Sequence, residues 1–259
     1  METALPPLSP DVPPPSSLFS RMANVIAAPG EVFQEVKAGP PSTANWLAPA
    51  LILILAGWLG GWLVLSQESV KQQLSDLTTK AIDRQIEKGK IPKEQAEAAR
   101  QAGQKYGGIG VKISMVATPV LAAFFTPFWW GLILWLVGTQ ALKGAFGYMK
   151  AVEVAGLANM IGLLDAVVKT LLIIALGNVF AAPSPALFLK DFDPQNTGHA
   201  LLGALSVMTL WLLAVRSVGL ARLSGASFGQ AAAWVFGLWA ALTGLMIGFG
   251  AAVRAAFGG

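Results

Sequence analysis

Long runs of apolar residues, separated by short polar segments, dominate the chain after residue 45. A run of about 20 apolar residues is what an α-helix needs to cross the hydrocarbon core of a bilayer. Five runs meet this condition, and we predict spans at about 46–65, 113–137, 152–180, 200–220 and 228–257. The pattern therefore predicts an all-α integral membrane protein whose five transmembrane helices occupy residues 46–257.

The segment 18–45, before the first span, has amphipathic spacing. Apolar residues recur at helical intervals in a first helix that Ser17 can cap, and Pro29 can open a second helix. Two short amphipathic helices before a span are typical of an interfacial segment that lies in the plane of the membrane surface. The alternative is that they pack on the cytoplasmic end of the bundle, and both arrangements remain open.

Two segments outside the spans are polar or Pro-rich. Residues 1–17 are rich in proline and serine and nearly uncharged, which predicts a disordered tail with polyproline character. Residues 66–108 form the one long polar stretch, and Gly89 and Pro92 can separate two helices within it. We predict an external helical hairpin that ends at Gly107-Gly108.

The composition excludes several kinds of chemistry. Only 12% of the residues are charged and 54% are hydrophobic, as expected for a multi-pass membrane protein. The chain has no cysteine and one histidine, so we predict no metal site and no cofactor. No nucleophile–base pattern is present, which argues against an enzyme. The basic residues lie between the spans, where they suit lipid headgroups rather than nucleic acid.

Asp165 and Lys169 are the main candidates for chemistry inside a span. Their i, i+4 spacing stacks them on one helix face, with the acid toward the N-terminus. A lone charge at mid-bilayer costs about 2.5–3.5 kcal/mol, so this intramembrane polar pair should face inward and neutralise itself. The pair fits either a structural ion pair that fixes helix packing or a proton or ion relay. The other spans supply no further acid for a relay, which favours the structural interpretation.

Three further features of the spans carry structural expectations. Arg216 lies near the cytoplasmic end of span four and can extend its guanidinium to the headgroups. We expect a packing or headgroup role for it rather than substrate binding. Trp46 is placed as an interfacial anchor at the start of span one. Gly237, Gly244 and Gly248 in span five are spaced so that another helix could approach closely.

The beginning of the chain resembles the start of bacterial members of the Yip family, the Ypt/Rab-interacting multi-pass membrane proteins. The resemblance rests on a P-x-E-V-F core followed by a tryptophan and a proline, here Pro29, Glu31, Val32, Phe33, Trp46 and Pro49. It implies a five-span helical membrane domain without known catalysis, and eukaryotic relatives are associated with Rab-type GTPases. The acidic-aromatic segment of those relatives is absent here, which argues against GTPase binding.

These observations lead to two functional hypotheses of different classes. The first is a non-enzymatic membrane-organising or scaffold protein of the Yip type, with membrane lipids and either other proteins or a second copy as partners. The second is a small transporter or channel that uses Asp165 and Lys169. We expect an integral protein of a bacterial inner membrane in either case.

The distribution of Lys and Arg predicts the orientation of the chain. Short segments rich in these bases face the cytoplasm, which places the N-terminus and the 139–150 connection inside. The hairpin carries eight bases of its own, but the short segments agree with one another and decide the assignment. Reporter fusions at Gln104 and Gly259 should both give an external signal; a cytoplasmic signal at both would overturn the orientation.

Overall fold

The computed structural model describes residues 16–190 and 192–257, and within these ranges every regular element is a helix. The predicted Pro-rich tail lies outside the described residues except for its last two positions. Five helical segments of the described chain are long and apolar enough to cross a membrane. They are α3 (Ala44–Leu65), α5 (Ala96–Leu136), α6 (Tyr148–Ala158) with α7 (Met160–Leu176), α9 (Val207–Ser224) and α10 (Phe228–Phe257). The predicted all-α, five-span fold class is confirmed.

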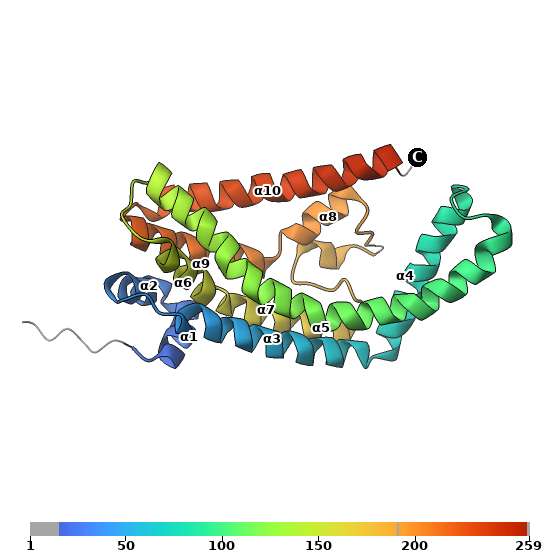
Figure 1. The fold of residues 1–259 in the computed structure, drawn as a ribbon, viewed down its shortest axis with the longest axis horizontal. Coiled ribbons are helices and arrows are strands. Elements are labelled where there is room, and N and C mark those ends of the chain that lie inside the picture. Colours follow the sequence, from blue (N-terminus) through green and yellow to red (C-terminus); the bar gives the residue numbers. More distant parts are fainter. Residues whose placement is uncertain (1–15, 191, 258–259) are drawn as a thin grey trace, which may run out of the picture.

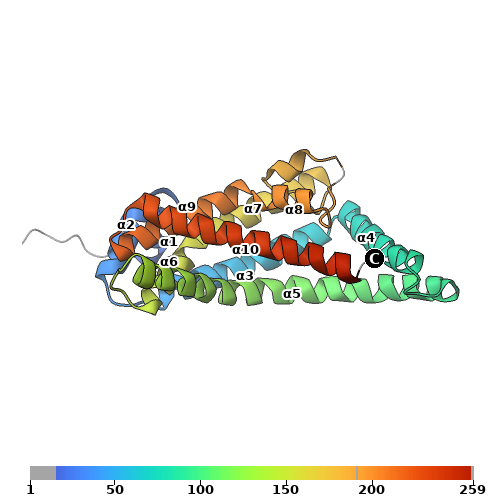
Figure 2. The ribbon, with the colours of Figure 1, turned by 90° about the horizontal axis from the view of Figure 1, so that it is seen from above.

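The spans run alternately along one elongated bundle (Figures 1 and 2). At one end lie the N-terminal helices α1 (Leu18–Ala27) and α2 (Pro29–Ala38), together with the connection from α5 to α6, which opens with the π-helical turn η2 (Val137–Ala141). At the other end lie α8 (Thr197–Ala204), the C-terminus and a projecting helical hairpin (Figure 1). The two ends of the described chain are thus at opposite ends of the bundle.

The hairpin differs from the prediction in where it ends. It consists of α4 (Glu68–Glu87), the short η1 (Lys93–Gln95) and the first part of α5, which continues without a break through Gly107-Gly108 into the second span. Glycine weakens a helix interior by about 1 kcal/mol but keeps its backbone hydrogen bond. One glycine of this part of α5 has a packing reason: a Cβ on Gly103 would clash with Ile82 of α4.

Spans three and four also have different limits from those predicted. Span three is divided at Asn159 into α6 and α7, and it ends at Leu176 because Gly177 adopts a left-handed conformation (φ 60°). Span four begins at Val207, because the residues before it form the separate helix α8, capped by the side chain of Asn196. Between these spans lies the short η3 (Pro185–Phe188).

The N-terminal helices pack on the bundle, the second of the two arrangements considered for them. Ser17 caps α1 by accepting a hydrogen bond from the Ser20 amide (3.1 Å), as predicted. The apolar faces of both helices are buried, with Val25 and Phe33 fully enclosed in the main core. The core therefore lies where α1 and α2 cover α6 and α9, at one end of the bundle.

Close approaches between helices occur at glycines other than those expected. A Cβ on Gly156 of α6 would lie 2.5 Å from the Trp46 Cα, and one on Gly219 of α9 would lie 2.2 Å from Val154 Cγ1. By contrast, a Cβ at Gly237, Gly244 or Gly248 of α10 would meet no atom within 4 Å. These three residues therefore make no close approach to another helix within the described chain.

The contrast predicts that a glycine-to-alanine change has different effects on stability at two positions. Gly156→Ala should destabilise the protein by about 1–3 kcal/mol, because the new methyl group overlaps the backbone of α3. Gly244→Ala should be neutral or slightly stabilising, since alanine has the higher helix propensity and the space is open. Thermal melting of both variants in detergent checks this, and equal melting temperatures would contradict the packing.

Candidate functional site

Buried polar side chains gather where the N-terminal helices meet the bundle. Asn45 and Glu153 are each 1% exposed, and Arg216 is 2% exposed. Polar groups removed from water at this level need hydrogen-bond partners to offset the lost hydration. The partners of these three residues define two neighbouring networks, which together form the candidate functional site.

The first network joins four helices through the amide of Asn45. Arg21 of α1 donates from Nη1 to Asn45 Oδ1 (2.9 Å), and Asn45 Nδ2 donates to Glu153 Oε2 on α6 (2.6 Å). The other carboxylate oxygen, Oε1, lies 3.4 Å from Lys150 Nζ. Lys150 Nζ in turn donates to the carbonyl of Val36 in α2 (2.5 Å). One buried carboxylate is thus balanced by two cations, one of which acts through the amide.

Local sequence explains how Asn45 reaches this position. It lies in the first turn of α3, and Pro49, four residues later, has no amide hydrogen to donate to the Asn45 carbonyl. This carbonyl faces α6, since a Cβ on Gly156 would lie 3.0 Å from it. The absence of side chains at Gly156 lets α6 come close enough for Glu153 to meet the Asn45 amide.

The second network holds Arg216 inside the bundle, which favours the packing role expected for it over the headgroup role. Its Nη2 donates to Asn159 Oδ1 (2.9 Å), and its guanidinium carbon lies 4.2 Å from the ring centre of Trp130. The amide at the break of span three and the aromatic face together replace part of the hydration of the cation. Its Nε is buried without a hydrogen-bond partner.

Asp165 and Lys169 form the ion pair that their spacing predicts, on α7 and apart from both networks. Lys169 Nζ lies 2.7 Å from Asp165 Oδ2. The side chains are 24% exposed at Asp165 and 40% at Lys169, so the pair lies at a partly covered position rather than deep in the core. Asp165 Oδ1 is buried and accepts no hydrogen bond.

The residues of the family-like motif have structural positions around the first network. Pro29 is the first residue of α2, Glu31 lies in its first turn, and Val32 and Phe33 are in the core. The Trp46 ring packs edge-on against Phe128 (centroids 4.9 Å apart), and its Nε1 is buried without a partner. Trp46 therefore contacts α5 through Phe128 and α6 through Gly156.

The sequence interpretation missed most of the site. Glu153 is an isolated acid in an apolar run, as Asp165 is, and this signal could have identified it. Asn45 and Arg21 carry no such signal, because their partners lie 108 and 24 positions away. The described residues include no group of three His, Cys, Asp or Glu side chains that could hold a metal ion.

Comparison with known families adds to this geometry. The family model for the Yip1 domain matches residues 23–249 of the chain. The chain belongs to the Yip1 domain family. Its Yip1 domain begins within α1 and ends within α10, so it contains four spans whole and most of the fifth. The family resemblance predicted from the P-x-E-V-F segment is thereby confirmed. No curated protein and no solved structure gives a significant match.

Most members of the first network lie within the Yip1 domain. Replacing one of them should lower the stability of the protein. Glu153→Leu should destabilise the protein by about 3–5 kcal/mol, because it leaves Lys150 and the Asn45 amide buried without their partner. Glu97→Leu is the matched control. Glu97 is 74% exposed and pairs with Arg100 at 3.8 Å, a contact whose loss should cost about 0–1 kcal/mol. Detergent melting curves of both variants give the comparison, and similar losses would show that the network adds little.

Proposed function

We propose that this Yip1 domain protein is a non-enzymatic membrane-organising scaffold that acts through helix–helix and lipid contacts. The observation that carries the proposal is the local pairing of charged groups within the spans. Glu153, Arg216 and Asp165 each contact a neighbouring polar side chain within 2.9 Å. The first two of these contacts join different helices, whereas the third lies within α7. Groups that are each satisfied by a near neighbour suit a structural role better than a chain along which an ion could move.

The outer surfaces of the protein supply the contacts that a scaffold needs. On α10, large apolar side chains such as Leu245, Met246 and Phe249 are 69–76% exposed, and they suit lipids or other membrane helices. The hairpin projects past the bundle (Figure 2), and its helix α4 is rich in polar residues. We propose membrane lipids and either other membrane proteins or a second copy of the chain as partners, without a GTPase. We assign the protein to a bacterial inner membrane with a cytoplasmic N-terminus.

Site-directed photocrosslinking in the native membrane tests the scaffold role. A photoreactive phenylalanine analogue replaces Tyr106 on the hairpin (63% exposed) or Phe249 on α10 (73% exposed), two aromatic positions where the change in shape is small. A scaffold should give discrete crosslinked protein products from at least one position. Samples without irradiation are the control, and a lack of discrete products from both positions would argue against the proposal.

A transporter or channel is the second candidate, favoured by one observation: Asp165 Oδ1 is buried without a hydrogen-bond partner. An unsatisfied carboxylate oxygen inside a span is typical of an ion or proton site. However, neither Asp165 nor Lys169 lines any of four surface cavities in the described part of the chain. These cavities lie beside Leu74, Arg222, Asp76 and Met115. This geometry supports the structural interpretation of the pair.

Variants of the pair separate the two candidates. Asp165→Asn should be less stable than the double variant Asp165→Leu with Lys169→Leu, because the single change leaves an ammonium group unpaired. Breaking a buried pair costs about 3–5 kcal/mol in soluble proteins, and the partial exposure of Lys169 lowers this value here. The double variant leaves an ordinary apolar helix.

The measurements are detergent melting and ion or proton flux in liposomes, each on wild type and both variants. We expect the wild type to give no flux above that of protein-free vesicles. A flux that Asp165→Asn abolishes would replace the scaffold with a transporter. A double variant less stable than the single one would contradict the structural role of the pair.

A further inference from the structure

A continuous groove runs along α5 from the hairpin into the membrane-spanning part of the bundle. Its outer part is a cavity of about 300 Å³ between α4 and α5, and its inner part is a cavity of about 340 Å³ between α3 and α5. Leu65 and Val111 line both cavities, so the two parts meet at these residues. The groove is therefore one surface feature that crosses the end of α3.

The inner part of the groove lies at membrane depth. α3 and α5 run antiparallel there, since a Cβ on Gly57 would contact Pro119, one on Gly61 would contact Met115, and Trp58 Nε1 donates to the Val116 carbonyl (3.0 Å). The surface between them is apolar and open on one side, with glycine, valine, methionine and proline in its lining. At this depth the surrounding solvent is lipid hydrocarbon, so an acyl chain is the natural occupant.

The outer part of the groove lies at the level where a headgroup would be. The same register continues from Gly57–Pro119 and Gly61–Met115 to Leu65, the last residue of α3, opposite Val111. Trp62, one turn earlier, is 60% exposed, as expected for an aromatic side chain at a membrane boundary. The lining of the outer cavity includes Lys71 and Lys112, which bring two ammonium groups to this level.

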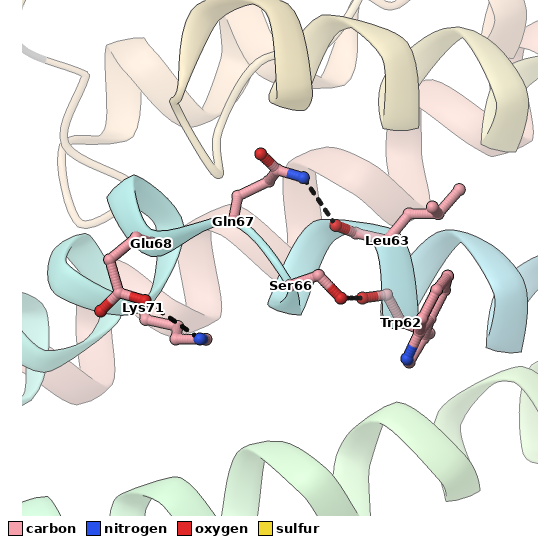
Figure 3. Close-up of polar contacts among 6 residues, drawn as sticks. All are labelled: Trp62, Leu63, Ser66, Gln67, Glu68 and Lys71. Carbon is pink, nitrogen blue, oxygen red and sulfur yellow. Dashed lines mark hydrogen bonds and ion pairs between the residues drawn. The ribbon is translucent and has the colours of Figure 1, made fainter.

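The contacts of these two lysines leave them available to an anion. Figure 3 shows the junction of α3 and α4, where Ser66 Oγ donates to the Trp62 carbonyl (2.7 Å) and Gln67 Nε2 to that of Leu63 (3.3 Å). These bonds lie next to the start of α4, on which Lys71 pairs with Glu68 (3.0 Å). The side chain of Lys71 is 52% exposed and that of Glu68 is 85% exposed, so solvent weakens this pair. No ion pair of Lys112 occurs among residues 16–190 and 192–257.

We propose that this groove binds one anionic phospholipid of the leaflet on the hairpin side. Its acyl chain lies between α3 and α5, and its phosphate lies between Lys71 and Lys112. Charge complementarity at the boundary and apolar lining below it match the two parts of this ligand. The site extends the lipid contacts of the proposed function but requires only that the bundle spans a membrane, so it can fail while the scaffold role holds.

The test is a lipid titration of the full chain in detergent, followed by native mass spectrometry. Phosphatidylglycerol is the anionic probe and phosphatidylcholine the neutral one, with the same acyl chains. The double variant Lys71→Gln with Lys112→Gln should bind the first phosphatidylglycerol about 10- to 30-fold more weakly. Phosphatidylcholine should lose less affinity than phosphatidylglycerol, because its choline group offsets the charge of its phosphate. The matched control, Lys93→Gln with Lys105→Gln, removes two exposed hairpin lysines outside the lining and should change binding less than about twofold.

A steric variant tests the acyl part of the site separately. Val111→Trp fills the point where the two cavities meet and should weaken the first binding event for both lipids. Soluble glycerophosphoglycerol at the concentration of the lipid should not compete, because it lacks the acyl chains. Three results would each overturn the proposal. The two lysine double variants lose the same affinity for phosphatidylglycerol, the Lys71/Lys112 variant keeps its affinity, or the soluble headgroup competes. If Val111→Trp does not fold, the lysine variants, which change exposed side chains, still decide it.

Discussion

The close approach of α6 to the start of α3 is the constraint on which the rest of the bundle depends. In a bilayer, burial of apolar surface gives little drive for helices to associate, so backbone proximity and polar contacts must hold them together. Gly156 allows the proximity, because any side chain there would overlap Trp46. The polar contact follows directly, since the Asn45 amide then lies 2.6 Å from the Glu153 carboxylate. A single small residue thus makes a buried charge tolerable.

The same contact explains why the N-terminal helices are part of the bundle. Arg21 of α1 and the Val36 carbonyl of α2 both join the network that is centred on Glu153. Phe33 adds apolar contact, fully buried beside α9, where it lies close to Gly219. Polar contacts specify the position of these helices, and apolar burial adds most of the stabilisation. An amphipathic segment of the kind that binds membrane surfaces thereby becomes part of the protein core.

Local features of this fold could be predicted from the sequence, and contacts between distant segments could not. Hydropathy predicts five spans because each must satisfy its own backbone hydrogen bonds in lipid. Ser17 and Pro29 mark helix starts through interactions within one turn. The Asp165–Lys169 pair is likewise local. The position of Arg216 depends on Asn159, 57 residues earlier, and Gly103 of α5 packs against Ile82 of α4. Periodicity within one segment contains neither kind of information.

The short length of α9 has a consequence for the bilayer itself. Its 18 residues span about 27 Å, whereas the 22 residues of α3 span about 33 Å. A typical hydrocarbon core is about 30 Å thick, so neighbouring sides of one protein match different thicknesses. Lipids beside α9 must shorten while those beside α3 extend or the helix tilts, each at a modest cost per ångström. The protein therefore presents the bilayer with spans of unequal length, a mismatch that helix tilt or local thinning of the bilayer accommodates.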